Sequence, residues 1–149
     1  MIPPAPPNNT TLVLRRTFTA SRQRVFRAWI TPRALEHWLR PRGRSVTVSQ
    51  LEARVGGSFR FDVEDGSSIV GTYLQIVPPE KLVFTWSGGA TPGRETVVTL
   101  DFLDQGVVTE VVLTHEGLST PEQRARAGTG WPSLLDALAE VLSSPHLDL

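Results

Sequence analysis

The chain has 149 residues, and its 15 Lys plus Arg are balanced by 15 Asp plus Glu. This length suits one domain. The zero net charge argues against a dedicated nucleic-acid binder and against attraction to anionic membranes. Cysteine is absent, so the chain has no disulfide and no thiolate metal site, which fits a cytoplasmic protein. Four tryptophans against one tyrosine are the unusual feature of the composition.

The two ends of the chain are expected to lie outside the folded domain. Residues 1–10 begin MIPPAPPNN, and this density of proline predicts a disordered lead-in without the features of a secretory signal. Residues 144–149 are expected to form a loose tail, which leaves residues 11–143 as a single domain. No apolar run approaches the roughly 20 residues that a membrane-spanning helix needs, so no membrane insertion is predicted.

The first part of the domain reads as one strand followed by two short helices. Thr11–Phe18 has strand character. Ser21 is a good N-cap for a helix with apolar residues at helical spacing up to Ile30. Pro32 ends this helix and suits the first turn of a second one, which is expected to run to about Leu39.

A series of strands follows, separated by turn sequences. Phe59 and Phe61 alternate with polar residues, which is typical of a half-buried antiparallel strand. Asp65-Gly66 indicates a hairpin, and the run GGATPG (88–93) predicts a flexible loop. The expected strands are Ser45–Arg54, Ser58–Glu64, Ser68–Val77, Lys81–Ser87, Glu95–Leu103 and Val107–Glu116.

The last element is predicted to be helical. The run STPE (119–122) has the form of a capping box, and an apolar stripe covers 131–142. Gly128 and Pro132 predict a break or kink inside this segment. The resulting order, β-α-α-β6-α, predicts an α+β protein whose antiparallel sheet covers the last helix.

Five segments in this order resemble the AHSA1-like family of the START and polyketide-cyclase (SRPBCC) superfamily. They are ALEHWLRPRG, LEARVGGSFRF, GTYLQIVPPEKLVFTW, LTHEGL and GWPSLLDALAEVL. The resemblance implies a helix-grip fold, in which a curved antiparallel sheet wraps a long C-terminal helix and an apolar cavity lies between them. Members of the superfamily bind lipids, sterols, polyketides or plant hormones, and a few catalyse cyclisation or hydrolysis. Function therefore does not follow from the fold alone.

The size of such a cavity is limited by stability. Ligand pockets begin at about 300 Å³, and an empty apolar void costs roughly 24 cal/mol per Å³. The product, about 7 kcal/mol, is comparable with the whole stability of a domain. The cavity is therefore expected to be small, wet or occupied.

Eight residues are expected to contact a ligand. The polar ones could hold a head group or water, and the aromatic ones could form flat walls. Trp29, in contrast, is interpreted as plain helix core. The ligand-binding candidates are Trp38, Glu52, Phe61, Tyr73, Trp86, His115, Trp131 and Leu135.

Several of these candidates have alternative interpretations. Glu52 could be a pocket carboxylate, but pairing with Arg54 or Arg60 is favoured because a buried, unpaired carboxylate is costly. His115 is more often a hydrogen-bonded core residue than a base. Trp38, Trp86 and Trp131 could equally be ordinary core residues instead of cavity wall. The arginines at 40, 42 and 44 could recruit an anionic group at the pocket mouth, or form a solvated face.

Three functions remain open. The first is binding of a small, mostly apolar molecule. The second is a cyclase or hydrolase that uses Glu52 or His115 as acid or base. The third is regulation of a chaperone ATPase, which is disfavoured because the eukaryotic activator also has a separate N-terminal chaperone-binding domain, for which this chain has no room.

No metal site or cofactor is predicted, because His37, His115 and His146 are far apart in the sequence and there is no nucleophile elbow or P-loop. Self-association as a homodimer through an exposed sheet face or edge is left open.

Overall fold

The computed structural model describes residues 10–88 and 91–143, and the side chains of 91–93 lie outside that description. The predictions of a disordered start and a loose tail fall on residues 1–10 and 144–149, which are outside the described residues except for Thr10. The elements in chain order are β1 (Thr11–Phe18), α1 (Arg22–Ala28), α2 (Pro32–Trp38), the 3₁₀ turn η1 (Pro41–Gly43), β2 (Val46–Leu51), β3 (Ser58–Val63), β4 (Ser68–Val77), β5 (Lys81–Gly88), β6 (Thr91–Asp104), β7 (Thr109–Glu116) and α3 (Pro121–Ser143).

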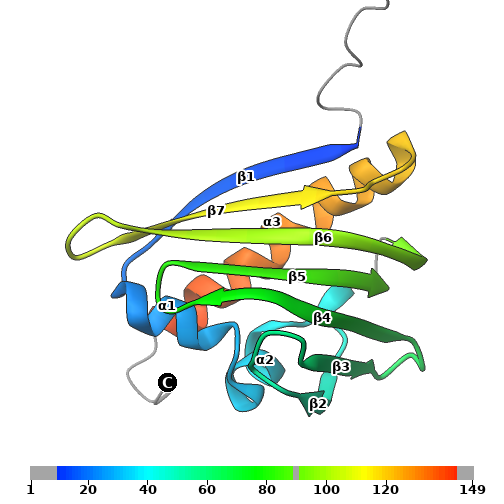
Figure 1. Ribbon diagram of the computed structural model, residues 1–149, viewed down its shortest axis with the longest axis horizontal. Helices are drawn as coiled ribbons and strands as arrows, with labels where there is room; N and C mark the ends of the chain where they lie inside the picture. Colours follow the sequence, from blue (N-terminus) through cyan, green and yellow to red (C-terminus); the bar gives the residue numbers. More distant parts are fainter. Residues whose placement is uncertain (1–9, 89–90, 144–149) are drawn as a thin grey trace, which may run out of the picture.

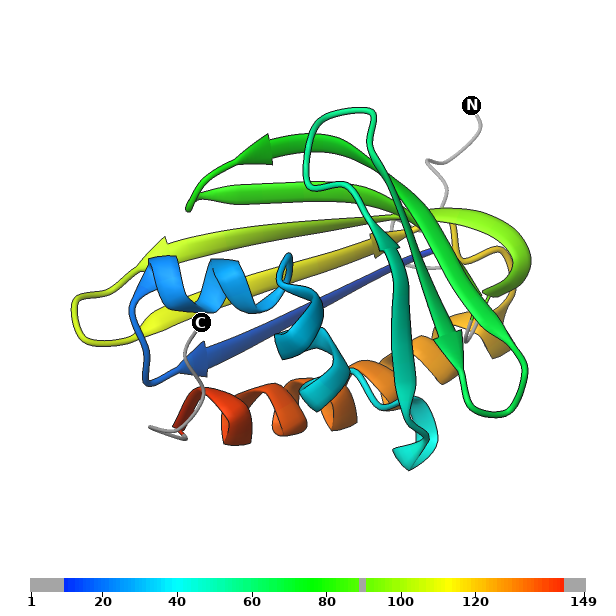
Figure 2. The same cartoon turned by 90° about the horizontal axis from the view of Figure 1, so that it is seen from below.

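The strands form one antiparallel sheet in the order β1-β7-β6-β5-β4-β3-β2. Strands β2 to β7 follow one another as hairpin neighbours, and β1 closes the other side by pairing with β7 (Figure 1). The sheet is strongly curved, and all three helices lie on its concave face (Figure 2). The predicted α+β class and element order are confirmed.

Strand alternation places the core on this concave face. Along β7, Val111, Leu113 and His115 are buried, whereas Glu116 is exposed. The same alternation buries Phe59 and Phe61 on β3, as the sequence pattern predicts. The apolar stripe of α3 packs against the inner face through a set of buried residues, Ala127, Trp131, Leu135, Leu138, Val141 and Leu142.

The structure corrects two expectations about local structure. The sequence predicts a break or a kink in the last helix; a break is wrong, because α3 is continuous through Pro132, and a kink stays a prediction. Proline removes one backbone hydrogen bond, but apolar residues on both sides of it pack on the sheet, and helices gain most of their stability from such packing. The predicted loop at 88–93 is shorter than expected, because Gly88 pairs with Thr91 and the strand ladder continues from there.

Among the described residues, no helix has both the length and the apolar character needed to cross a bilayer.

Candidate ligand-binding cavity

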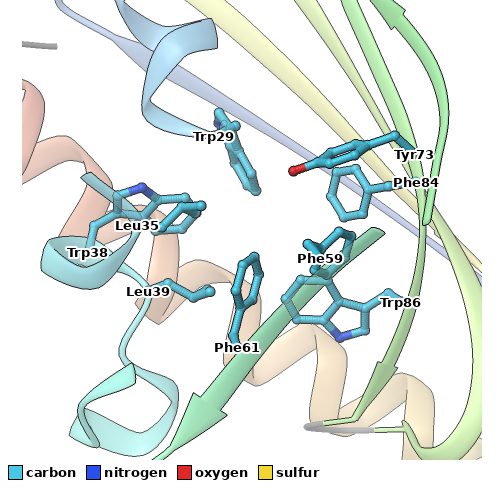
Figure 3. A pocket seen from close by; sticks show the side chains of 9 residues that line it. All are labelled: Trp29, Leu35, Trp38, Leu39, Phe59, Phe61, Tyr73, Phe84 and Trp86. Atoms are coloured by element: carbon cyan, nitrogen blue, oxygen red, sulfur yellow. The ribbon is translucent and has the colours of Figure 1, made fainter. Parts of the chain in front are cut away.

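A small cavity lies between the two short helices and strands β3, β4 and β5 (Figure 3). This differs from the expected position between the sheet and the C-terminal helix, because no residue of α3 lines it. The difference arises because α1 and α2 themselves fold onto the concave face of the sheet (Figure 2). The lining residues are Trp29, Leu35, Trp38, Leu39, Phe59, Phe61, Tyr73, Phe84 and Trp86.

The cavity wall is almost entirely aromatic. Seven of the nine lining residues have aromatic rings, and none carries a charge. The rings pack on one another: Phe59 stacks on Phe61 with centroids 4.8 Å apart, and Trp29 meets Trp38 edge-on at 4.6 Å. Such contacts add about 0.5–1.5 kcal/mol per pair to the burial itself. The wall is therefore a set of flat apolar faces.

Local sequence explains how these rings converge. The i, i+2 spacing of Phe84 and Trp86 on β5 directs both side chains to the concave face. On the opposite side, Pro32 begins α2 directly after α1, so that the two helices form a tight corner. The indole nitrogen of Trp38 donates a 2.9 Å hydrogen bond to the Ala28 carbonyl, which ties α2 to the end of α1.

The cavity is too small for an organic ligand in this arrangement. The space open to the centre of a water molecule is about 10 Å³, roughly enough for one water. Of the three outcomes expected from the energetic argument, the structure shows a small cavity. A ligand would have to displace lining side chains in order to enter.

Tyr73 brings a hydroxyl group to this apolar space. Its side chain is 2% exposed, and Figure 3 shows its oxygen pointing into the space beside Trp29. None of the described residues hydrogen-bonds to this hydroxyl. Burial raises the pKa of Tyr73 well above its usual value of 10, so the group stays a neutral hydroxyl at physiological pH. It can both donate and accept a hydrogen bond.

Trp29 is a buried core residue, as the sequence indicates, and lies at the C-cap of α1. It also lines the cavity, which the sequence did not indicate. Sequence reasoning likewise missed Leu35, Leu39, Phe59 and Phe84 as lining residues. The alternation that revealed Phe61 and Trp86 applies equally to Phe59 and Phe84, and this signal could have found them.

His115 is buried beside α3 and outside the cavity wall. It is 1% exposed, its Nδ1 lies 3.0 Å from the indole nitrogen of Trp131, and its Nε2 lies 2.7 Å from the hydroxyl of Thr96. Both ring nitrogens are engaged, which fits the interpretation as a hydrogen-bonded core residue. Burial lowers the pKa of His115 to about 4, so the ring is neutral at pH 7. Trp131 and Leu135 are buried on α3 and do not line the cavity either.

Glu52 follows the end of β2 and is half exposed. Its carboxylate lies 3.5 Å from Arg54 and accepts a 3.1 Å hydrogen bond from the backbone nitrogen of Ser58. Pairing with an arginine was the favoured interpretation, and the structure confirms it for Arg54. Arg60 pairs with Asp62 instead, at 2.9 Å.

Glu52 and His115 do not share a site. Glu52 follows β2, which lies five strand positions from β7 in the sheet order. Neither residue is in the cavity wall, and both ring nitrogens of His115 are already hydrogen-bonded. Within the described part of the chain, no group of three or more His, Asp or Glu side chains is placed to hold a metal ion.

The three arginines at 40, 42 and 44 lie in and beside η1 on the surface. Arg40, Arg42 and Arg44 are all exposed, and Arg44 lies 3.8 Å from Asp65. This is the arrangement of a solvated face.

The curved sheet, its gripping helix and the aromatic cavity define a protein of the helix-grip type, a fold that typically binds small ligands. The chain belongs to the family described as Activator of Hsp90 ATPase homolog 1-like protein, whose model matches residues 19–143. It is 27% identical over 121 residues to the human activator of 90 kDa heat shock protein ATPase homolog 1, and 26% identical to the mouse protein. The match covers 80% of this chain but 33% of each of those proteins, so the chain spans about a third of their length.

Solved bacterial structures are similar over nearly their whole length. A crystal structure of a protein from Chromobacterium violaceum matches with a TM-score of 0.80 and 27% identity, covering 91% of this chain and 99% of that one. A protein from Rhodobacter sphaeroides matches with a TM-score of 0.79 and 26% identity, covering 92% and 94%. A Mycobacterium smegmatis protein, at 18% identity and a TM-score of 0.75 over 93% of this chain and 94% of that one, shares the fold.

Proposed function

We propose that this protein binds a small, mostly apolar molecule of lipid, polyketide or aromatic type, with one polar end, in the cavity between α1–α2 and β3–β5. The observation that carries the proposal is the Tyr73 hydroxyl, which points into a wall of otherwise apolar faces (Figure 3). A few polar groups in a mainly hydrophobic and aromatic pocket are the usual composition of a small-molecule site.

The polarity of the wall indicates the kind of ligand. The wall holds no charged side chain, so a charged group placed against it would lose hydration without compensation. A ligand with one hydrogen-bonding group could pair with the Tyr73 hydroxyl, and a hydrogen bond of this kind contributes about 0.5–1.5 kcal/mol. The Trp29 indole nitrogen, on a residue that also lines the cavity, is buried without a partner among the described residues and could donate to such a group. Flat rings favour stacking with a flat, uncharged partner.

Entry of a ligand requires one side of the cavity to move. The sheet side is held by the antiparallel pairing of β3, β4 and β5, with one register shift between Tyr73 and Gln75, whereas the helix side consists of two seven-residue helices. On α2, the Glu36 carboxylate accepts a 2.8 Å hydrogen bond from the backbone nitrogen of Val48, and the Trp38 indole binds Ala28. Outward displacement of α2 breaks these two hydrogen bonds, whereas Arg24 on α1 donates to the Leu142 carbonyl at the end of α3. We therefore infer that α2 is the part that opens.

The test compares two ligands that differ by one hydroxyl. Naphthalene and 2-naphthol are titrated against the wild type and Tyr73→Phe, with binding followed by tryptophan fluorescence and calorimetry. The wild type is expected to bind both, and Tyr73→Phe to lose about five- to tenfold in affinity for 2-naphthol only, which is the usual effect of one hydrogen bond. Thr109→Val serves as the control, because it removes a buried hydroxyl from a residue that does not line the cavity. Absence of binding to the wild type would overturn the proposal.

A second candidate, regulation of a chaperone ATPase, is favoured by the names of the human and mouse relatives. Its test is the ATPase rate of a chaperone of the 90 kDa heat-shock class with and without the purified chain. Stimulation that survives Trp38→Ala would separate this activity from the cavity.

A further inference from the structure

A chain of hydrogen bonds crosses the core beside the cavity. The Trp131 indole nitrogen on α3 lies 3.0 Å from Nδ1 of His115 on β7. Nε2 of His115 lies 2.7 Å from the Thr96 hydroxyl on β6, and this hydroxyl lies 2.7 Å from the backbone carbonyl of Trp86 on β5. The side chains of Trp131, His115 and Thr96 are each 3% exposed or less. This series of hydrogen bonds therefore links the C-terminal helix to three adjacent strands.

The chemistry of the groups fixes which atom donates and which accepts in each of these hydrogen bonds. An indole N–H can only donate, so Nδ1 of His115 must accept. The neutral ring then carries its proton on Nε2 and donates it to the Thr96 oxygen. Thr96 in turn donates its hydroxyl proton to the Trp86 carbonyl, which can only accept. Each bond fixes the next, and only one orientation of the Trp131 indole satisfies them all.

This orientation bears on the cavity wall. The Trp131 ring packs against Trp86 at a centroid distance of 5.2 Å and against Trp29 at 6.1 Å. Trp86 and Trp29 both line the cavity, from the sheet side and the helix side respectively, whereas Trp131 does not. Trp131 thus supports two wall residues from outside the cavity, and its own position is set by His115 and Thr96.

Apolar packing alone would not require these polar groups. Three buried polar side chains are tolerated in a core only when they are hydrogen-bonded, and aliphatic residues could fill the same volume. What the polar chain adds is a unique geometry, since a satisfied network of this kind rigidifies its surroundings.

We propose that Thr96 and His115 are positioning residues for ligand binding, which hold Trp131 so that it sets the shape of the cavity wall at Trp86 and Trp29. This inference rests on the proposed function of the cavity. A preorganised wall raises affinity because less ordering is needed when the ligand binds. Loss of the Thr96 hydroxyl should therefore weaken binding of any ligand that stacks on the wall, whether or not that ligand carries a hydroxyl.

The test uses naphthalene and 2-naphthol with a matched pair of threonine variants. Thr96→Val and Thr109→Val each remove a buried hydroxyl that donates to a backbone carbonyl, but Thr109 donates to Ala20 and lies outside the chain of hydrogen bonds. Thr96→Val is expected to weaken both ligands by about five- to tenfold, as for coupled side chains in contact. Thr109→Val should leave both affinities unchanged, and Thr96→Ser, which keeps the hydroxyl, should restore them.

An independent signature comes from nitrogen NMR of the wild type and the variants. The wild type should show His115 protonated on Nε2 alone and a hydrogen-bonded indole N–H for Trp131, and Thr96→Val should shift both signals. Trp131→Phe, which keeps an aromatic ring without the donor, provides a second variant if Thr96→Val does not fold. If the wild type binds and Thr96→Val binds equally well, the positioning role is wrong while the proposed function stands. If the wild type does not bind, both fail.

Discussion

Two groups of aromatic side chains meet at Trp86, and the structure holds them in different ways. On the cavity side, Phe59, Phe61 and Phe84 pack on one another through ring contacts, and phenyl rings form no hydrogen bonds. On the other side, Trp131 is fixed through His115 by hydrogen bonds of defined direction. The first group is held by ring packing alone, whereas the second is also held by hydrogen bonds between its polar atoms.

Under the proposed function, this difference explains how a ligand could enter so small a cavity. Ring contacts are weak individually and not strongly directional, so the rings of the cavity side can separate when a ligand replaces their contacts. The polar side gives the separated rings a wall of constant shape. Under the same proposal, the cavity of about 10 Å³ is the closed form of an adaptable half of the core next to a rigid half.

The largest effect is expected for Trp38→Ala on the adaptable side. Trp38 is fully buried, so its truncation should reduce the free energy of unfolding by about 3–5 kcal/mol. Phe102→Ala should have a similar effect on stability, because Phe102 is 1% exposed, but it does not line the cavity. Urea unfolding measures both, and naphthol titration separates them: only Trp38→Ala should change affinity. Equal changes in affinity would mean that stability alone controls binding.

The rigid side should be sensitive to pH. The pKa of His115 falls from its usual value of 6.5 to about 4 in the folded protein, because the ring is buried. Between these values the unfolded chain binds the proton and the folded protein does not, so stability is complete above about pH 6.5 and is lost as the pH falls toward 4. The total loss is about 3 kcal/mol.

Urea unfolding at a series of pH values measures this loss, and His115→Gln is the control, since it has no proton to gain. Protonation of Asp62 and Asp65 does not account for a loss of stability between pH 6.5 and 4. The pKa of each is lowered below 3.8, mainly by hydrogen bonds from serine side chains, so they titrate below this range. A wild type whose stability does not change between pH 6.5 and 4 would contradict the assignment of His115 as a buried, neutral ring.

The two sides also differ in how far the sequence predicts them. Alternation along β3 and β5 identified Phe61 and Trp86, because a strand's geometry is local. The lining role of Trp29 was missed, since it depends on how the corner between α1 and α2 folds onto the sheet. The pairing of His115 with Trp131 depends on where α3 lies across β7, which is a tertiary feature. Continuity of α3 through Pro132 is also a result of packing, which overrides local propensity.

A smaller effect is expected for Glu36→Ala, which should lower stability but raise affinity for the ligand. Its carboxylate on α2 accepts the 2.8 Å hydrogen bond from the Val48 backbone at the sheet edge. Glu36→Ala should lower stability by about 1–2 kcal/mol, the usual effect of losing a charged acceptor. Because this bond holds the closed form, its loss should raise affinity for naphthalene, as expected when a closed state is destabilised. Calorimetry decides: lower affinity in Glu36→Ala would mean that α2 is not the part that opens.

The smallest effect is expected for Glu52→Gln, at the edge of the molecule. The Glu52 side chain is 42% exposed and its partner Arg54 is 68% exposed, and an ion pair of this kind contributes little because water and salt screen it. Glutamine keeps an oxygen that can accept the hydrogen bond from Ser58. Stability and naphthol affinity should both stay within the error of urea unfolding and calorimetry. A tenfold loss of affinity would instead place the carboxylate in contact with the ligand, and the binding site would then extend from the adaptable rings to the end of β2.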